Sequence, residues 1–223
     1  MLRNFLGHEA RIIGVDLNPS CKIFEKYGFE IEILNQSNKK SWNEFFTRVG
    51  KVDIIIEDGG HTNFQQINSL SSCINNIRDG GIYLCEDTHT SYWPEFGNPS
   101  KTSFIEFIKT SIDIINSRGP RIKRVDREEF NNVYSIQFFE SVVCLLVDST
   151  KSIPSERITN AGKSLAHRDF RNLDRSFRSK ISVFQTSISQ REKSLSRSML
   201  YRLANFLLGI IYRIENFSLR KFF

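Results

Sequence analysis

The chain has 223 residues, of which 39% are hydrophobic, 25% charged and 12% aromatic, and its formal net charge is +6. This composition is that of a globular protein and excludes collagen-like, coiled-coil and wholly disordered chains. Because there is no apolar run of about eighteen residues and no basic N-terminal segment followed by an apolar stretch, the sequence predicts neither a membrane-spanning helix nor a signal peptide, and we expect a cytoplasmic protein.

The charge is unevenly divided along the chain. Residues 1–150 hold 16 Lys and Arg against 20 Asp and Glu, whereas residues 151–223 hold 15 against 5. Strand-like apolar runs also stop at Val147, and a Ser-, Arg- and Lys-rich stretch follows. We therefore expect an α/β domain over residues 1–150 and a basic, mainly helical C-terminal extension over residues 151–223.

The first expected elements alternate between strand and helix. Residues 11–17 form an apolar, β-branched run that is typical of a buried parallel strand. A helix is expected over residues 21–27, where Gly28 ends it, and residues 30–34 alternate as a half-exposed strand does. A second helix is expected over residues 42–49.

The clearest strand covers residues 52–56. Thr62 and Gln65 then form a T-x-x-Q capping box, which predicts a helix from about residue 63 to residue 77. The Asp-Gly-Gly sequence at residues 79–81 is expected to end that helix, and residues 82–85 to form the next strand.

The last expected elements of this half are a helix over residues 102–116 and two strands over residues 134–138 and 142–147. Glu140 and Ser141 join these two strands, which indicates an antiparallel hairpin at the edge of the sheet. Alternating strands and helices predict an α/β, Rossmann-like fold with a mostly parallel sheet. In such folds ligands bind beyond the carboxyl ends of the strands.

Acidic side chains follow two successive predicted strands. Asp58 comes shortly after residues 52–56, and Glu86 and Asp87 follow residues 82–85. If these strands are neighbours, about 4.8 Å apart, the three carboxylates converge at one edge of the sheet. Hard oxygen donors are the ligands that Mg²⁺ prefers, so this set predicts a magnesium site, provided that the strand pleat ends before Glu86.

His61 lies three residues after Asp58, in the turn before a helix. An imidazole titrates near pH 6.5 and can accept a proton from a hydroxyl that a bound cation has acidified, so His61 is the candidate general base. Each residue of this set also has a structural interpretation, since an Asp after a strand often forms a turn and a lone His is often exposed. Their combination at two strand ends favours the functional interpretation.

These residues carry a family resemblance. The D-G-G-H segment that starts at Asp58 and the E-D-T-H-T-S-Y-W segment that starts at Glu86 resemble class I S-adenosylmethionine-dependent methyltransferases, specifically the metal-dependent sugar O-methyltransferases of macrolide tailoring. The resemblance covers about residues 8–148. It implies that Asp58, Glu86 and Asp87 hold Mg²⁺, and that His61 deprotonates a sugar hydroxyl that attacks the methyl group of S-adenosylmethionine.

The same resemblance implies further site residues. The Gly14-to-Pro19 segment is similar to the family's second strand, whose acid binds the cofactor ribose, although an Asp before Asn-Pro can equally be a turn former. The segment that starts at Asn35 is similar to the one near the adenine, with Asn where the family often has Asp. The implied cofactor-binding residues are Asp16, Asn35, Gln36 and Asp58, and the implied substrate-binding residues are His89, Tyr92 and Trp93.

The family's first strand and glycine-rich turn have no counterpart, because only ten residues with a single glycine precede Arg11. We therefore expect a chain truncated at its N-terminus. The two strands that flank the first strand should then either leave a gap in the sheet or pair directly. An alternative alignment takes residues 11–17 as the first strand, with Asp16-Leu17-Asn18 in place of the glycine turn.

The C-terminal extension contains a predicted amphipathic helix at residues 199–219 and a preceding stretch, residues 151–198, that reads as loosely ordered or as solvent-exposed helix. Three roles fit the helix: peripheral membrane contact through residues 199–221, packing on the α/β domain, or homo-oligomer formation. No recognised module accompanies the basic charge, so we do not expect nucleic-acid binding. The apolar positions of the helix are Leu200, Leu203, Leu207, Ile210 or Ile211, Ile214 and Phe217.

The leading functional hypothesis is an S-adenosylmethionine-dependent, Mg²⁺-assisted O-methyltransferase that acts on a hydroxyl of a sugar or glycosylated metabolite. The alternative is a truncated, non-catalytic protein of methyltransferase fold that binds a partner or a membrane surface through its basic helix. A third hypothesis is a metal-dependent enzyme with another small ligand in place of the methyl donor.

Overall fold

The computed structural model describes residues 2–97, 100–118, 128–154, 180–181, 183–184 and 199–219. The chain divides into two compact units, Met1–Arg157 and Ile158–Phe223. Most of the stretch 151–198, for which loose order or exposed helix is predicted, lies outside the described residues.

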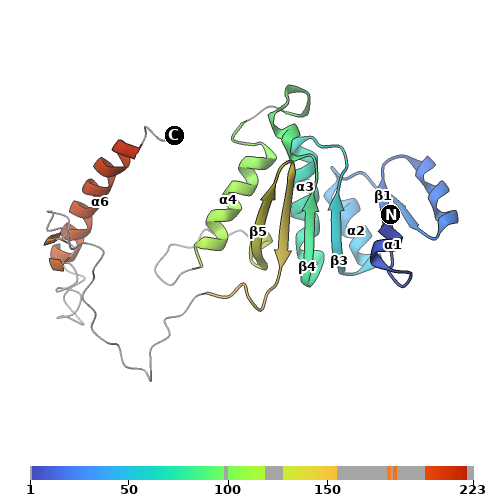
Figure 1. The fold of residues 1–223 in the computed structure, drawn as a ribbon, viewed down its shortest axis with the longest axis horizontal. Coiled ribbons are helices and arrows are strands. Elements are labelled where there is room, and N and C mark those ends of the chain that lie inside the picture. Colours follow the sequence, from blue (N-terminus) through green and yellow to red (C-terminus); the bar gives the residue numbers. More distant parts are fainter. Residues whose placement is uncertain are drawn as a thin grey trace, which may run out of the picture. The chain divides into compact units, whose positions relative to one another are not determined.

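The first unit contains the predicted strands and helices in the predicted order (Figure 1). Two of them differ in character: the helix expected over residues 21–27 is a 3₁₀ helix, and the strand expected to be buried over residues 11–17 has no buried residue. Its strands are β1 (Ile13–Asp16), β2 (Glu30–Ile33), β3 (Val52–Glu57), β4 (Ile77–Cys85), β5 (Val133–Phe139) and β6 (Val142–Val147). Its α-helices are α1 (Leu2–Leu6), α2 (Lys39–Val49), α3 (Asn63–Cys73) and α4 (Phe104–Asn116). Short 3₁₀ segments cover Pro19–Tyr27, Ile74–Asn76, Thr88–Tyr92, Pro94–Phe96 and Glu128–Phe130.

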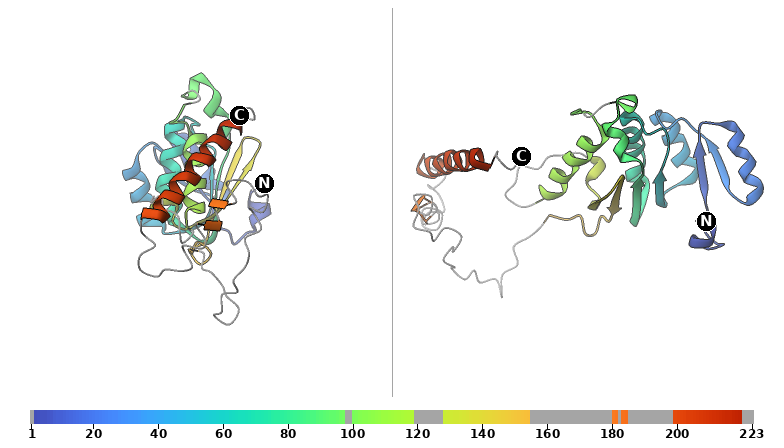
Figure 2. Two further views of the ribbon diagram at one scale, coloured as in Figure 1. Left: turned by 90° about the vertical axis from the view of Figure 1, so that its left-hand side faces the viewer. Right: turned by 45° about the horizontal axis from the view of Figure 1, so that its top comes forward.

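The sheet topology confirms a Rossmann-like α/β fold with an antiparallel edge hairpin. Strand β1 pairs in parallel with β2, and β3 pairs in parallel with β4. Strand β6 is antiparallel to both β4 and β5, so the larger sheet has the order β3-β4-β6-β5. Of the two arrangements expected for the strands that flank the family's first strand, the described residues adopt the unpaired one: β1 and β3 belong to separate sheets (Figure 2).

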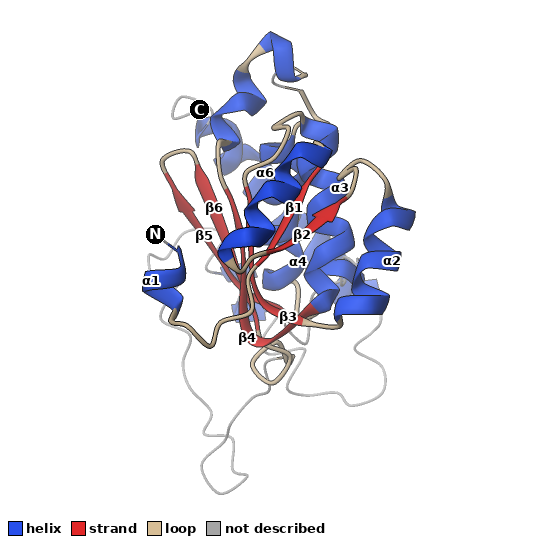
Figure 3. Ribbon diagram, turned by 90° about the vertical axis from the view of Figure 1, so that its right-hand side faces the viewer, coloured by secondary structure: helices blue, strands red, loops and turns tan. Residues whose placement is uncertain are grey.

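One hydrophobic core joins three helices to one face of the larger sheet (Figure 3). Because successive strand residues point to opposite faces, alternate residues of β4 and β6 enter this core. The other face is more open, and Ile54 and Ile56 of β3 are 44% and 46% exposed there. Core members include Trp42 and Phe45 of α2, Leu70 of α3, Phe104 and Ile108 of α4, Tyr83 and Cys85 of β4, and Val143 and Leu145 of β6.

Strand β4 starts earlier than predicted, and this corrects the expectation that the Asp-Gly-Gly sequence ends a helix. Helix α3 already ends at Cys73, and residues 79–81 lie inside β4. Gly80 has a φ of +85°, and the pairing of β3 with β4 is irregular between Val52 and Ile54. A Cβ on Gly81 would collide with the Asp53 carbonyl oxygen, so this glycine allows the two strands to approach at the irregularity.

Two neighbouring leucines of β6 test this packing. Leu145 is fully buried, whereas Leu146 lies on the open face and is only half-buried. We expect Leu145→Ala to lower the free energy of unfolding by about 2–5 kcal/mol, because it leaves a cavity in a packed core. Leu146→Ala should cost about half as much or less, since less apolar surface is buried there. Denaturant unfolding of both variants measures the difference, and equal losses would contradict this assignment of faces.

The second unit contains helix α6 (Met199–Leu219), which confirms the helix predicted there. Leu207, Leu208 and Ile211 of α6 pack with Ile181. Other members of the predicted apolar stripe are exposed: Leu203, Ile210, Ile214 and Phe217. Among the described residues, no helix is both long enough and apolar enough to cross a membrane.

Candidate active site

A buried carboxylate holds the loop that follows β3. Glu57 ends the strand and is 8% exposed; its Oε1 accepts a hydrogen bond from Nε2 of Gln36 at 2.9 Å, and its Oε2 accepts one from the Cys85 thiol at 3.0 Å. Burial and the nearby Glu57 charge raise the pKa of the Cys85 thiol, so this donor keeps its proton. The next carboxylate along the chain, Asp58, is exposed.

Gln36 also fixes the glycine turn after Asp58. Its Oε1 accepts a hydrogen bond from the Gly60 N–H at 2.9 Å, and a Cβ on Gly59 would collide with its side-chain amide. Gly59 therefore lets the turn approach the amide closely. In the structure Gln36 supports the loop through Glu57 and Gly60, and its predicted cofactor contact remains a prediction.

The predicted capping box is confirmed and places His61 directly before α3. The Gln65 N–H donates to Oγ1 of Thr62 at 3.3 Å, and the Thr62 N–H donates to Oε1 of Gln65 at 3.2 Å. These bonds set the start of the helix. His61, the residue before the cap, has a left-handed backbone with a φ of +59°.

The segment after β4 leaves the strand conformation at once. Strand β4 ends at Cys85, and Asp87 has a left-handed φ of +52°, so the pleat has ended before the acidic pair, as the predicted site requires. The Thr90 hydroxyl, in a residue 3% exposed, lies 2.7 Å from the Asp87 carbonyl oxygen and 3.0 Å from that of His61. A single hydroxyl thus connects the two left-handed residues at neighbouring strand ends.

Three of the predicted residues come together at this point. Nε2 of His61 lies 3.9 Å from Oδ1 of Asp58 and 3.9 Å from Oδ2 of Asp87. One nitrogen or oxygen atom of each residue lies within 4.8 Å of the other two. Glu86, the third predicted metal ligand, is not part of this group; its backbone is bonded to Glu57 and Gln66.

The chemistry of this group fits a divalent cation. Two ligands that each lie about 2.1 Å from Mg²⁺ are at most about 4.2 Å apart. An oxygen of Asp58 and one of Asp87 already lie within 4.8 Å of each other, so a small side-chain movement would bring both to one ion. Nε2 of His61 faces the two carboxylates, whereas its Nδ1 is buried without a hydrogen-bond partner. Within the described residues, Asp58, His61 and Asp87 form the only such cluster of candidate ligands.

The predicted substrate-binding residues border this cluster. The His89 ring packs edge-on against Trp93, with ring centroids 4.8 Å apart and planes at 79°. Trp93 in turn lies 6.0 Å from the Phe96 ring, which lies 6.3 Å from the His61 ring. Aromatic side chains therefore run from His89 to His61. Tyr92 is 55% exposed.

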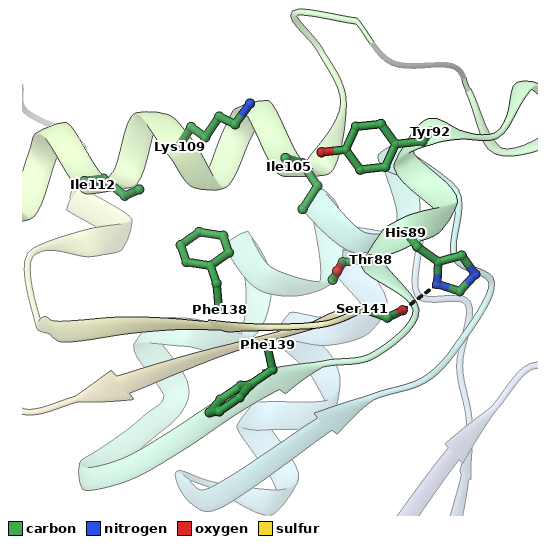
Figure 4. A pocket seen from close by; sticks show the side chains of 9 residues that line it. All are labelled: Thr88, His89, Tyr92, Ile105, Lys109, Ile112, Phe138, Phe139 and Ser141. Atoms are coloured by element: carbon green, nitrogen blue, oxygen red, sulfur yellow. Dashed lines mark hydrogen bonds between the residues drawn. The ribbon is translucent and has the colours of Figure 1, made fainter. Parts of the chain in front are cut away.

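Two adjoining cavities open beside His89. One, of about 590 Å³, is lined by the polar residues Asp87, His89, Glu140 and Ser141. The other, of about 420 Å³, lies between α4 and the β5–β6 hairpin and shares His89 and Ser141 with the first (Figure 4). Both are wide open to solvent and are depressions of the surface, not enclosed cavities. The remaining residues that line the second cavity are Thr88, Tyr92, Ile105, Lys109, Ile112, Phe138 and Phe139.

Asp16 and Asn35, predicted to bind the cofactor, form turns at the ends of β1 and β2. Oδ1 of Asp16 accepts a hydrogen bond from the Asn18 N–H at 2.7 Å, and this bond, with a further one to Cys21, lowers the pKa of Asp16. Oδ1 of Asn35 accepts one from the Ser37 N–H at 2.9 Å. Both residues are exposed, and their contact with a cofactor remains a prediction.

Four residues that support the site were not predicted from the sequence: Glu57, Asn63, Thr90 and Ser141. Oδ1 of Asn63, in a residue 8% exposed, accepts hydrogen bonds from the Ser91 hydroxyl and from the Phe104 N–H, and so ties the loop after β4 to the start of α4. Only Glu57, an acid at the end of an apolar strand, has a sequence signal. Each of the other three has at least one partner that is distant in the chain.

The Thr90 hydroxyl gives a direct test of how the site is held. We expect Thr90→Val, which keeps the side-chain shape, to lower the free energy of unfolding by about 1–3 kcal/mol, because two carbonyl oxygens lose a buried donor. Thermal denaturation measures this loss. The control is Thr110→Val, whose hydroxyl bonds to the Phe107 carbonyl oxygen on the exposed side of α4. If the two variants lose the same free energy of unfolding, the hydrogen bonds of Thr90 to Asp87 and His61 stabilise the protein no more than an ordinary surface hydrogen bond does.

The chain is similar in sequence to several curated O-methyltransferases. No protein-family model matches the chain. The chain is 41% identical over 83 residues to L-olivosyl-oleandolide 3-O-methyltransferase of Streptomyces antibioticus, a match that covers 33% of this chain and 22% of that enzyme. It is 30% identical over 110 residues to demethylmacrocin O-methyltransferase of Streptomyces fradiae, covering 49% and 27%. The chain thus spans about a quarter of the length of these curated relatives.

The fold has counterparts among solved structures. The MycE methyltransferase of the mycinamycin biosynthetic pathway, solved in complex with Mg and SAH, superposes with a TM-score of 0.57 at 22% sequence identity. The superposition covers 62% of this chain and 37% of that one. At this level of identity the likeness establishes a shared methyltransferase fold.

Proposed function

We propose that this homologue of the sugar O-methyltransferases transfers a methyl group from S-adenosylmethionine to a hydroxyl of a sugar or glycosylated metabolite, with the help of a divalent cation. The observation that carries the proposal is the group of Asp58, His61 and Asp87 at the carboxyl ends of two neighbouring parallel strands. Ligands of α/β folds bind at such strand ends.

Each residue has a chemical role in this proposal. Asp58 and Asp87 would hold the cation, with Glu86 as the proposed third carboxylate. A divalent cation supplies positive charge that acidifies a nearby hydroxyl. His61 would accept the proton of that hydroxyl, and the loop would orient the resulting oxygen toward the methyl group. Asp16, Asn35, Gln36 and Asp58 are the proposed contacts of S-adenosylmethionine.

The acceptor is proposed to lie beside His89, Tyr92 and Trp93. The cavity next to Asp87, which polar residues line, suits a sugar, and the adjoining cavity under α4 offers Ile105, Ile112 and Phe138 to an apolar group (Figure 4). Exposed aromatic rings such as those of Tyr92 and Trp93 pack well on sugar rings and on apolar ring systems. A glycoside with an apolar aglycone therefore fits this surface better than a free sugar.

The proposal is tested by methyl transfer from isotopically labelled S-adenosylmethionine to a panel of glycosides, with and without a chelator. We expect transfer that a chelator abolishes and that added Mg²⁺ restores. Transfer that persists after complete metal removal would contradict the role of the cation.

The alternative, a non-catalytic protein of methyltransferase fold, is favoured by the separation of β1 from β3. Calorimetry with S-adenosylmethionine distinguishes the two proposals, because tight binding requires a formed cofactor site. The small molecule that copurifies with the protein tests the third hypothesis, an enzyme with another ligand in place of the methyl donor.

The basic helix α6 is proposed to contact an anionic membrane surface. Leu203, Ile210 and Ile214 are exposed, and Arg202 and Arg213 are exposed on the same helix. Sedimentation with anionic vesicles should recover the protein in the pellet at low salt and release it at high salt. If the protein stays in the supernatant with vesicles present, α6 does not bind the membrane surface, and packing or self-association remains as its role.

A further inference from the structure

The turn of the β5–β6 hairpin contacts the loop after β4 through one residue, Ser141. Its carbonyl oxygen accepts a hydrogen bond from the Thr88 N–H at 3.0 Å. Its hydroxyl is hydrogen-bonded to Nδ1 of His89 (Figure 4). Ser141 therefore ties together two segments that are more than fifty residues apart in the chain, and it lines both cavities at the candidate site.

The backbone of Ser141 is strained in a way that marks the site. Ser141 has a φ of +62°, and among the described non-glycine residues only His61 and Asp87 share a positive φ. Such a conformation costs about 1–3 kcal/mol for a residue with a Cβ, and these outliers cluster at functional sites. A glycine would adopt it without strain, so the turn alone does not require a serine.

The contacts around His89 define what Ser141 can do. Asp87 approaches the same ring nitrogen as Ser141, with its Oδ1 3.8 Å from Nδ1. A serine that acts as a nucleophile needs its base and the orienting acid on opposite ring nitrogens, so this arrangement is not a catalytic triad. Instead, Ser141 holds Nδ1 while Trp93 packs against the ring, which leaves Nε2 as the nitrogen available to a ligand.

We propose that Ser141 is a positioning residue, whose hydroxyl orients the His89 imidazole so that Nε2 hydrogen-bonds a hydroxyl of the acceptor. The acceptor contact rests on the proposed methyltransferase function, whereas the hold of Ser141 on His89 does not. An imidazole held in one orientation binds best those acceptors whose hydroxyl lies within hydrogen-bond distance of Nε2. An imidazole that rotates freely does not select among acceptors in this way.

Two variants at one position separate this role from turn formation. Ser141→Ala and Ser141→Gly both remove the hydroxyl, but only the glycine relieves the left-handed strain. Nitrogen-15 NMR of the His89 ring nitrogens in the full chain, without added metal or ligand, is expected to show the same change in both variants. Thermal stability should diverge, with Ser141→Gly the more stable. The control is Ser135→Ala, on strand β5 of the same hairpin.

The outcomes distinguish this proposal from the proposed function. Unchanged His89 ring signals in Ser141→Gly would overturn the positioning role, whatever the activity. If the His89 signals change but the protein transfers no methyl group, Ser141 does position His89. The proposed function is then refuted, together with the acceptor contact that rests on it. In an active protein, both variants should raise KM for the acceptor about tenfold and change kcat little. The hydrogen bond from His89 to the acceptor would be made equally in the bound substrate and in the transition state, so its loss weakens binding. A lowered kcat at unchanged KM would overturn the acceptor contact.

Discussion

Replacing His61 by Asn is expected to lower the rate of methyl transfer about 10²–10⁴-fold, which is the usual contribution of a general base. The imidazole is the candidate proton acceptor beside Asp58 and Asp87, and an asparagine amide cannot accept the proton. Asparagine is the appropriate replacement because His61 has a left-handed backbone, which Asn tolerates better than Ala. Single-turnover transfer of a labelled methyl group measures the effect.

A second variant at the same position tests whether the strained backbone of His61 is retained for function at a cost in stability. His61→Gly should raise the free energy of unfolding by about 1 kcal/mol, since glycine adopts a positive φ at no steric cost, and it should abolish transfer. The control is His8→Asn, at an exposed histidine near the N-terminus. Transfer by His61→Asn within about threefold of the unmodified protein would remove His61 from the mechanism.

The periodicity of the sequence was sufficient to predict the elements that carry the site. The apolar run before Asp58 and the T-x-x-Q box after His61 are local signals, and the strand forms and the helix begins where these signals place them. The start of β4 could not be predicted in this way. Its Asp-Gly-Gly sequence usually ends an element, but here close approach to Asp53 across the sheet decides the conformation.

The residues of the candidate site could be predicted from the sequence, but their backbone conformations and contacts could not. Residue types at two strand ends indicated Asp58, His61 and Asp87, because parallel strands place their carboxyl ends at one edge. Asp87 is left-handed and its carbonyl oxygen bonds to the Thr90 hydroxyl, a conformation that the residue pattern did not predict. The role of Ser141 could not be predicted from the sequence, because its partner His89 lies on another element.

Removing either carboxylate of the cluster is expected to weaken divalent-ion binding at least about tenfold, or about 1.4 kcal/mol. Asp58→Asn and Asp87→Asn each replace a charged oxygen ligand by a neutral amide of the same shape, so the loss reports the charge and not the packing. Titration of Mn²⁺ by electron paramagnetic resonance, followed by competition with Mg²⁺, measures the dissociation constants. The control is Asp53→Asn, an exposed carboxylate of β3 that is bonded to Arg78 at 2.8 Å.

Glu86→Gln separates the ligand set predicted from the sequence from the group that the structure assembles. Because the Glu86 carboxylate lies outside that group, we expect a smaller loss of affinity than for either aspartate. A loss as large as theirs would mean that the loop after β4 rearranges when the ion binds and brings Glu86 into its coordination. Wild-type affinity in both aspartate variants would instead show that the cluster is not a metal site, and His61 would then lack the cation that acidifies its proton donor.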